Sequence, residues 1–185
     1  MKTKTRAAEN STLRTPRSAL AIVALGSNLG DSQKILHAAM ARLQAFSDEP
    51  ILKSSLWQTS PVDCPPGSPN FVNAVVALVP QKDETPETLL QKIHSLEKAF
   101  GRERKEIHNE PRPLDLDLIV FADEVRTSAS LTLPHPRAHE RRFVLQPLCE
   151  IAPDLTLPGQ TQPVAQLLAG LRDTGSCEKI GSTTA

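Results

Sequence analysis

Hydrophobic positions along the chain alternate between a period typical of strands and one typical of helices. A continuous apolar run that ends in glycine and serine, Leu20 to Ser27, predicts a buried strand. After Asp31 or Ser32, either of which can cap a helix, apolar residues recur at helical spacing as far as Phe46. The first ordered elements are therefore predicted to be a strand and then a helix.

Two strands, a second helix and a last strand follow. The runs ILKSSLWQTS and FVNAVVALVP predict strands, and the intervening PVDCPPGSPN has too many prolines for regular structure. The helix is predicted to begin after Thr85, with Pro86 in its first turn and Gly101 past its end. LDLDLIVF predicts the last strand, and Trp57 is expected in the core.

This order of elements is the split βαβ of ferredoxin-like α+β folds. We predict a ferredoxin-like βαββαβ sandwich to which residues 131–172 add a C-terminal strand or helices. One domain is expected over residues 19–172, between a disordered tail at residues 1–18 and a flexible tail at residues 173–185. A transit peptide is the alternative for the first tail, although Glu9 and weak amphipathicity argue against it.

Composition narrows the class of partner. Lys plus Arg and Asp plus Glu number 21 each, so no net field attracts nucleic acid or an anionic membrane. No apolar run approaches the roughly 20 residues that cross a bilayer. Three cysteines at scattered spacings form neither a zinc motif nor a disulfide framework, which fits a reducing cytoplasm. We expect a cytoplasmic monomer that binds small molecules, and no nucleic acid or membrane.

The last predicted strand carries two aspartates where Val or Thr is usual. Because side chains alternate along a strand, Asp115 and Asp117 face one way together with Ile119 and Phe121. The opposite, core-facing row is Leu114, Leu116, Leu118 and Val120. Two residues of strand separate the carboxylates by about 6 to 7 Å, which suits Mg²⁺ shared with substrate phosphates. The alternative is a strand end that points its acids into water.

Cationic segments accompany these acids. The loop GRERKEIHNEPRP precedes the strand and carries Arg102, Arg104 and Arg112, and guanidinium groups beside Mg²⁺ neutralise phosphate oxygens. PHPRAHERR adds His135 between two prolines, with Arg137, Arg141 and Arg142 near it. Ordinary solvated loops are the alternative for both segments.

Some familiar motifs are missing from the sequence. It contains neither GxxxxGK[ST] nor GxGxxG, and no nucleophilic triad is recognisable. The two glycines of ALGSNLGD are explained better by a turn than by a phosphate-binding loop. The pattern therefore predicts catalysis by positioning and electrostatics, without a protein nucleophile.

Five segments resemble, in order, those of the 6-hydroxymethyl-7,8-dihydropterin pyrophosphokinase family. They are LGSNLGD, NFVNAVVAL, LEKAFGRERK, PRPLDLDLIVF and LPHPRAHERRFVLQPLCEIAPDL, and together they cover about Ala21 to Leu157. The resemblance implies a folate-pathway enzyme, a 2-amino-4-hydroxy-6-hydroxymethyldihydropteridine diphosphokinase. Such an enzyme transfers diphosphate from Mg·ATP to the hydroxymethyl group of the dihydropterin and releases AMP.

The resemblance also implies roles for single positions. Asp115 and Asp117 would bind two Mg²⁺ ions that bridge the ATP phosphates, and Arg102 and Arg112 would be catalytic phosphate contacts. The positions implied for ATP are His94, Glu97, Arg104, Leu118, Thr132, His135 and Arg141. Those implied for the pterin are Thr59, Pro61, Val62, Phe71, Asn73 and Phe143.

Physical chemistry agrees with the pterin positions, because a flat heterocycle needs an aromatic face and an amide partner for its polar edge. Core packing of the two phenylalanines and a strand-end hydrogen bond of Asn73 are the alternatives. This chain departs from many members at residues 108–113, where HNEPRP replaces a segment whose tryptophan helps to cover the pterin. His94 and Ser130 likewise replace a frequent glutamine and arginine.

Two other classes of protein remain open from the sequence. A metal-dependent phosphodiesterase or nucleotidyl transferase can carry a DxD strand on a related fold. A non-enzymatic ferredoxin-like module could bind RNA or a regulatory ligand, although an aromatic content of 3% argues against an RNA surface.

Overall fold

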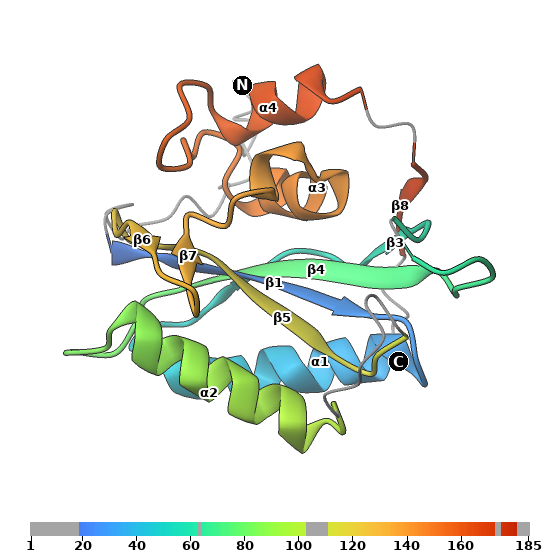
Figure 1. Cartoon of the computed structure of the whole chain (residues 1–185), viewed down its shortest axis with the longest axis horizontal. Coiled ribbons are helices and arrows are strands. Elements are labelled where there is room, and N and C mark those ends of the chain that lie inside the picture. The colour runs from blue at the N-terminus through green and yellow to red at the C-terminus, as the bar shows by residue number, and fades with distance from the viewer. Residues whose placement is uncertain (1–18, 63, 103–110, 173–174, 181–185) are drawn as a thin grey trace, which may run out of the picture.

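The computed structural model describes residues 19–62, 64–102, 111–172 and 175–180. An antiparallel sheet forms the middle layer, with α1 and α2 on one face and α3 and α4 on the other (Figure 1). The elements are β1 (Ala21–Ser27), α1 (Ser32–Leu43), η2 (Gln44–Phe46), β2 (Leu52–Lys53), β3 (Trp57–Thr59), β4 (Phe71–Leu78), α2 (Pro86–Ala99), β5 (Asp115–Phe121), β6 (Arg126–Thr127), β7 (Thr132–Leu133), η3 (Ala138–Glu140), α3 (Arg142–Ile151), α4 (Val164–Gly170) and β8 (Cys177–Lys179).

The sheet has the strand order β5-β1-β4-β3-β8, and β2 also pairs with β4. Its central strands β1 and β4 are buried on both faces, which is why they appear in the sequence as continuous apolar runs. The run ILKSSLWQTS, predicted as one strand, is divided into β2 and β3. Ser54 lies between them, and its Oγ accepts from Val75 N at 2.9 Å in place of regular strand pairing.

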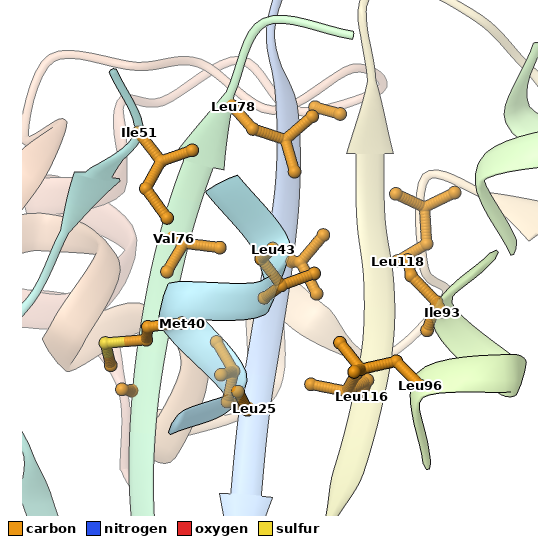
Figure 2. Packing of buried hydrophobic residues seen from close by; sticks show 14 of the residues in the cluster. Leu25, Met40, Leu43, Ile51, Val76, Leu78, Ile93, Leu96, Leu116 and Leu118 are labelled. Atoms are coloured by element: carbon orange, nitrogen blue, oxygen red, sulfur yellow. The ribbon is translucent and has the colours of Figure 1, made fainter. Parts of the chain in front are cut away.

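One face of the sheet, formed by side chains of β1, β4 and β5, packs against α1 and α2 (Figure 2). Both helices begin where the sequence predicted, because Asp31 accepts from Lys34 N and Thr85 forms a capping box with Thr88. Buried side chains of this layer include Leu25, Met40, Leu43, Val76, Ile93, Leu96, Leu116 and Leu118. The helices therefore fix the sheet from one side and leave the other side for α3 and α4.

A bulge interrupts the alternation of β5. Ile22 pairs with Val120, but the next residue of β1, Val23, pairs with Leu118, so Ile119 is an extra residue in β5. Beyond it, Phe121 packs with the α1/α2 layer and Val120 with the α3/α4 layer. The predicted faces of Val120 and Phe121 are therefore wrong, because uninterrupted alternation cannot anticipate an inserted residue.

The alternation holds before the bulge. Leu114, Leu116 and Leu118 are buried in the α1/α2 layer. Asp115 and Asp117 are half-buried, and they point to the opposite side of the sheet. The expected C-terminal helices are present as α3 and α4, whose apolar side chains pack on that side.

The last described segment also differs from prediction. Cys177–Lys179 forms β8 and pairs with β3, where the sequence predicted a flexible tail. This strand is polar, so periodicity could not reveal it. The predicted tail at residues 1–18 lies outside the described residues, as do residues 173–174 and 181–185.

Glu150 of α3 ties this edge of the sheet together. Its carboxylate accepts from Ser55 N and Oγ at 2.9 and 2.7 Å, from Trp57 Nε1 at 3.3 Å and from Lys179 Nζ at 2.8 Å. Trp57 is thus a half-buried hydrogen-bond donor at the sheet edge, and its predicted place in the core is wrong. In the part of the chain that the structure describes, no helix has the length and apolar character that a membrane crossing requires.

We expect Glu150→Ala to lower the free energy of unfolding by about 1–2 kcal/mol at neutral pH, because a charged acceptor of several hydrogen bonds is lost. Burial raises the pKa of Glu150, but the hydrogen bonds from Lys179, Ser55 and Trp57 outweigh it and hold the pKa below its usual value. The stabilisation is therefore present above the unfolded-state pKa of about 4.3 and disappears as pH falls through the folded-state pKa.

Urea unfolding of both proteins at pH 7 and at about pH 3 measures this effect. Glu178→Ala, which removes an exposed acid from β8, the strand that carries Lys179, is the matched control and should change stability by less than about 0.5 kcal/mol. An equal difference between wild type and Glu150→Ala at both pH values would contradict the assignment.

Candidate active site

A cavity of about 340 Å³ opens at one end of the sheet. The end of β1, the end of β3 and the beginnings of β4 and β5 meet there, since Gly26 pairs with Asn73 on one side and with Asp115 on the other. The cavity is lined by Ala24, Leu25, Gly26, Thr59, Ser60, Val62, Cys64, Phe71, Asn73, Arg102, Arg112, Asp115, Asp117, His135, Arg137, Arg141 and Phe143. Antiparallel pairing thus brings residues from distant parts of the chain to one edge.

Asp115 is the centre of the charged half of the cavity. Its Oδ1 lies 2.8 Å from Arg102 Nη1 and its Oδ2 lies 3.2 Å from Arg112 Nη1. Burial raises the pKa of Asp115 and the neighbouring charge of Asp117 raises it further, whereas Arg112, Arg102 and Arg141 lower it. The pKa stays above its ordinary value, so this carboxylate depends on nearby cations to keep its charge.

Glu97 contacts Arg102 from α2 and does not line the cavity. It is 4% exposed, and its Oε1 accepts from Leu116 N at 2.8 Å while it forms an ion pair with Arg102. Arg102 is therefore held between Glu97 on α2 and Asp115 on β5. The side chain that the family resemblance assigns to ATP contacts a guanidinium of the cavity wall in this structure.

Two hydrogen bonds fix His135. Its backbone N–H donates to the carbonyl of Ile119, the bulge residue, at 2.9 Å, and its ring Nδ1 accepts from Arg137 N at 3.3 Å. Burial, and then the charge of Arg141, lower the pKa of His135, which favours a neutral ring at physiological pH. The ring hydrogen then lies on Nε2 and is available to an acceptor in the cavity.

The other half of the cavity combines an amide with aromatic rings. Asn73 is 5% exposed and donates from Nδ2 to Thr59 Oγ1 at 2.7 Å. A Cβ on Gly26 would lie 3.2 Å from Asn73 Oδ1, which is closer than ordinary van der Waals contact, so a side chain at position 26 would crowd this amide. Phe71 lines the wall beside it, and the guanidinium of Arg141 lies 5.4 Å from the ring centre of Phe143.

The structure brings most of the predicted site residues together, but not all. His94 on α2, Leu118 in the α1/α2 core and Thr132 on β7 do not line the cavity. Pro61 is absent from its wall, although both neighbours line it, and Arg104 lies outside the described residues. Leu118 is buried because it alternates with the aspartates.

The sequence assigned no role to several residues that the cavity includes. Gly26, Ser60 and Cys64 line it, and Arg137, expected only near His135, lines it too. Gly26 and Arg137 belong to the motifs LGSNLGD and PHPRAHERR, so their signal was visible. Ser60 and Cys64 follow β3 in a proline-rich loop, where no periodicity indicates direction.

The donor set fits a polyphosphate bound with a hard cation. Among residues 19–62, 64–102, 111–172 and 175–180, no three His, Cys, Asp or Glu side chains form a complete metal site. Two carboxylates suit Mg²⁺, which keeps several waters and takes substrate phosphates as ligands. Nε of Arg112 is buried and finds no hydrogen-bond partner within the described residues, so one donor remains for an anionic oxygen.

Acids that can hold Mg²⁺, with guanidinium groups beside them, are recurring parts of enzymes that transfer phosphoryl groups. The comparison with protein families names the class. Residues 22–153 match the family described as 7,8-dihydro-6-hydroxymethylpterin-pyrophosphokinase (HPPK), and the chain belongs to this family.

Individual relatives agree with this assignment. The chain is 39% identical over 148 residues to the 2-amino-4-hydroxy-6-hydroxymethyldihydropteridine pyrophosphokinase of Synechocystis sp., covering 80% of this chain and 74% of the relative. It is 35% identical over 153 residues to the Haemophilus influenzae protein of the same name, covering 83% and 93%.

Solved structures share the fold. A crystal structure of wild-type Plasmodium falciparum HPPK-DHPS with pteroate has a TM-score of 0.64 and 13% identity. The match covers 81% of this chain and 44% of that longer chain. At this identity the likeness concerns the fold alone.

We expect Glu97→Ala to lower the free energy of unfolding by about 2–4 kcal/mol, because it leaves Leu116 N–H buried without an acceptor and Arg102 without one of its acids. Glu97→Gln keeps an acceptor oxygen for Leu116 and should lose less. Urea unfolding measures both variants. Glu124→Ala, which breaks an exposed ion pair with Arg126, is the control, and an equally small effect of Glu97→Ala would contradict this role.

Proposed function

We propose that this chain transfers diphosphate from ATP to the hydroxymethyl group of 6-hydroxymethyl-7,8-dihydropterin and releases AMP, as a step of folate biosynthesis. The single observation that carries the proposal is the division of one cavity into a charged half around Asp115 and an amide–aromatic half around Asn73. Each half suits one substrate, and their junction is where the hydroxymethyl group would meet the phosphates.

In this proposal Asp115 and Asp117 hold two Mg²⁺ ions. Mg²⁺, when bound there, would offset the charge of the ATP phosphates. Asp115 would then exchange Arg102 and Arg112 for metal as its counter-charges, which frees both guanidinium groups to donate to phosphate oxygens. The buried Nε of Arg112 supports this assignment, because it is a donor without a partner among the described residues.

Around the phosphates, His135 would donate from Nε2, and Arg141 and Arg104 would supply further positive charge. Glu97 would act by holding Arg102. The remaining positions proposed for ATP are His94, Leu118 and Thr132, which rest on the family resemblance alone. The cavity would enclose the reacting groups and leave the transfer to positioning and charge, with no covalent intermediate on the protein.

On the pterin side, Asn73 would present its carboxamide to the polar edge of the heterocycle, and Thr59 would fix the amide. Phe71 and Phe143 would cover the ring faces, and Pro61 and Val62 would border them. The hydrogen bond from Asn73 Nδ2 to Thr59 Oγ1 supports this arrangement, since it fixes which end of the amide faces the cavity.

Further features of the chain stay proposals. The strand order β5-β1-β4-β3 with α1 and α2 on one face supports the ferredoxin-like βαββαβ arrangement. Cys64, Cys149 and Cys177 form no disulfide within the described residues, which supports a reducing compartment such as the cytoplasm. A monomer that binds no nucleic acid remains our expectation from the sequence.

The direct test is incubation of the protein with ATP, Mg²⁺ and 6-hydroxymethyl-7,8-dihydropterin, with chromatography of the products. The expected products are pterin diphosphate and AMP in equal amounts. Release of diphosphate with transfer of AMP to an acceptor would favour the nucleotidyl-transferase class, and cleavage of a phosphodiester without any need for the pterin would favour the phosphodiesterase class.

We expect Asp115→Ala and Asp117→Ala each to lower the turnover number by about 10³-fold or more, because each removes a carboxylate that binds the cations of the transferring group. Circular dichroism should show an unchanged fold. Near-normal rates with an unaltered requirement for Mg²⁺ would refute the metal assignment.

We expect Arg112→Ala to lower kcat by about 10²-fold or more and to change the KM for ATP little, because its contact with phosphate strengthens in the transition state. Steady-state kinetics with ATP as the varied substrate measures this. Arg126→Ala removes a guanidinium that pairs with Glu87 and Glu124 outside the cavity, and it should leave both constants unchanged. A change confined to KM would mean that Arg112 binds only ground-state ATP.

A further inference from the structure

The motif LGSNLGD contains an asparagine, Asn28, that does not line the cavity. Asn28 follows β1 and contacts Arg112, which lies 84 positions later in the chain. Asn28 Oδ1 accepts from Arg112 N at 2.8 Å, and Asn28 N donates to Arg112 O at 3.2 Å. One residue therefore satisfies both backbone polar groups of a proposed catalytic arginine.

The sequence around Arg112 explains why this contact matters. Arg112 lies between Pro111 and Pro113, which have no backbone N–H, so it carries the single N–H donor of these three residues. The ladder between β1 and β5 ends at the pair Gly26 and Asp115, before Arg112 is reached. Asn28 supplies the hydrogen bonds that the sheet does not extend to this position.

The burial of Asn28 is consistent with a residue that holds the backbone of Arg112 in place. It is 5% exposed, so its hydrogen bonds are shielded from water. The neighbouring polar residues serve the turn itself: Ser27 Oγ donates to Ser32 Oγ at 2.8 Å, and Asp31 caps α1. Within the part of the chain that the structure describes, Asn28 is the one of these four residues whose hydrogen bonds reach the segment before β5.

The side chain of Arg112 begins from this fixed backbone. Its Nη1 reaches Asp115 Oδ2 at 3.2 Å, while its Nε is buried without a partner among the described residues. A guanidinium that acts by position loses much of its effect when its backbone shifts by about 1 Å. Fixing the backbone of Arg112 is therefore as necessary for its proposed role as the guanidinium itself.

We propose that Asn28 is a positioning residue that clamps the backbone of Arg112 and so holds its guanidinium at Asp115 in the geometry that diphosphate transfer needs. The inference rests on the proposed function, since it adds a support to that same site. It also gives the LGSNLGD motif a task beyond forming a turn.

The first test is kinetic. Asn28→Ala should lower kcat by about 10- to 100-fold and leave the KM values for ATP and the pterin within about twofold. In the double variant Asn28→Ala/Arg112→Ala, the loss should not exceed that of Arg112→Ala alone, because both changes remove one function. Multiplicative losses would overturn the proposal.

The second test does not depend on activity. Hydrogen exchange of the Arg112 amide, followed by NMR in the protein without substrates, should be slow in the wild type and fast in Asn28→Ala. Asn28→Asp keeps an acceptor oxygen for Arg112 N. It replaces the amino group, Nδ2, which has no partner within the described residues, with a second oxygen that shares a negative charge. This variant should keep the Arg112 amide protected and recover part of the lost kcat.

Asp31→Ala is the matched control in the same turn. It removes the cap of α1 and should lower the melting temperature, but it should leave kcat and the exchange of the Arg112 amide unchanged. If Asn28→Ala does not fold, Asn28→Ser, whose hydroxyl is too short to reach Arg112 N, replaces it in both tests.

The outcomes separate the clamp from the reaction. A protected Arg112 amide and a normal kcat in Asn28→Ala would overturn the proposal, even if the melting temperature fell. Full activity of Arg112→Ala, together with fast exchange at position 112 in Asn28→Ala, would refute the role of Arg112 in the proposed function, and the exchange data would still report the contact itself.

Discussion

The charged half of the cavity depends on one half-buried acid at the end of the sheet, Asp115. Removing the Asp115 carboxylate from water is unfavourable unless cations lie beside it. Arg102 follows α2 and Arg112 precedes β5, and both contact this carboxylate. Each arginine in turn has a partner elsewhere in the fold: Arg102 pairs with a second acid, and the backbone of Arg112 is hydrogen-bonded.

A residue from a different element contacts each arginine. Glu97 balances Arg102 and at the same time accepts from Leu116 N, which joins α2 to the beginning of β5. Asn28 bonds the backbone of Arg112, which joins the end of β1 to the same strand. The contacts around Asp115 therefore link α2, β1 and β5 at the charged half of the cavity.

Much of this arrangement could be predicted from the sequence, because hydrophobic periodicity reports directly on burial. The long strands β1, β4 and β5 and the capped helices α1 and α2 follow from apolar runs and cap residues. The pair Asp115 and Asp117 was visible because two acids in an apolar strand contradict strand composition. The motif resemblance then indicated which cationic residues belong with them.

The remaining features depend on tertiary contacts that leave no periodic signal. β8 is polar and is held by backbone pairing and by Glu150. Ser54 divides one predicted strand through a hydrogen bond to β4. Glu97 was assigned to a substrate because family motifs identify positions, whereas its contact with Leu116 N and its ion pair with Arg102 are evident only in three dimensions.

The bulge at Ile119 has a consequence for any attempt to move this site into another protein. The extra residue lets a single strand present acids toward the cavity at its start and still bury Phe121 under the opposite face at its end. Its carbonyl also accepts from the backbone N–H of His135 at 2.9 Å, so the backbone that carries this histidine is anchored to the bulge. A designer who grafted the two acids onto a regular strand would lose both the packing and the anchor, and would need to transplant the irregular backbone together with the side chains.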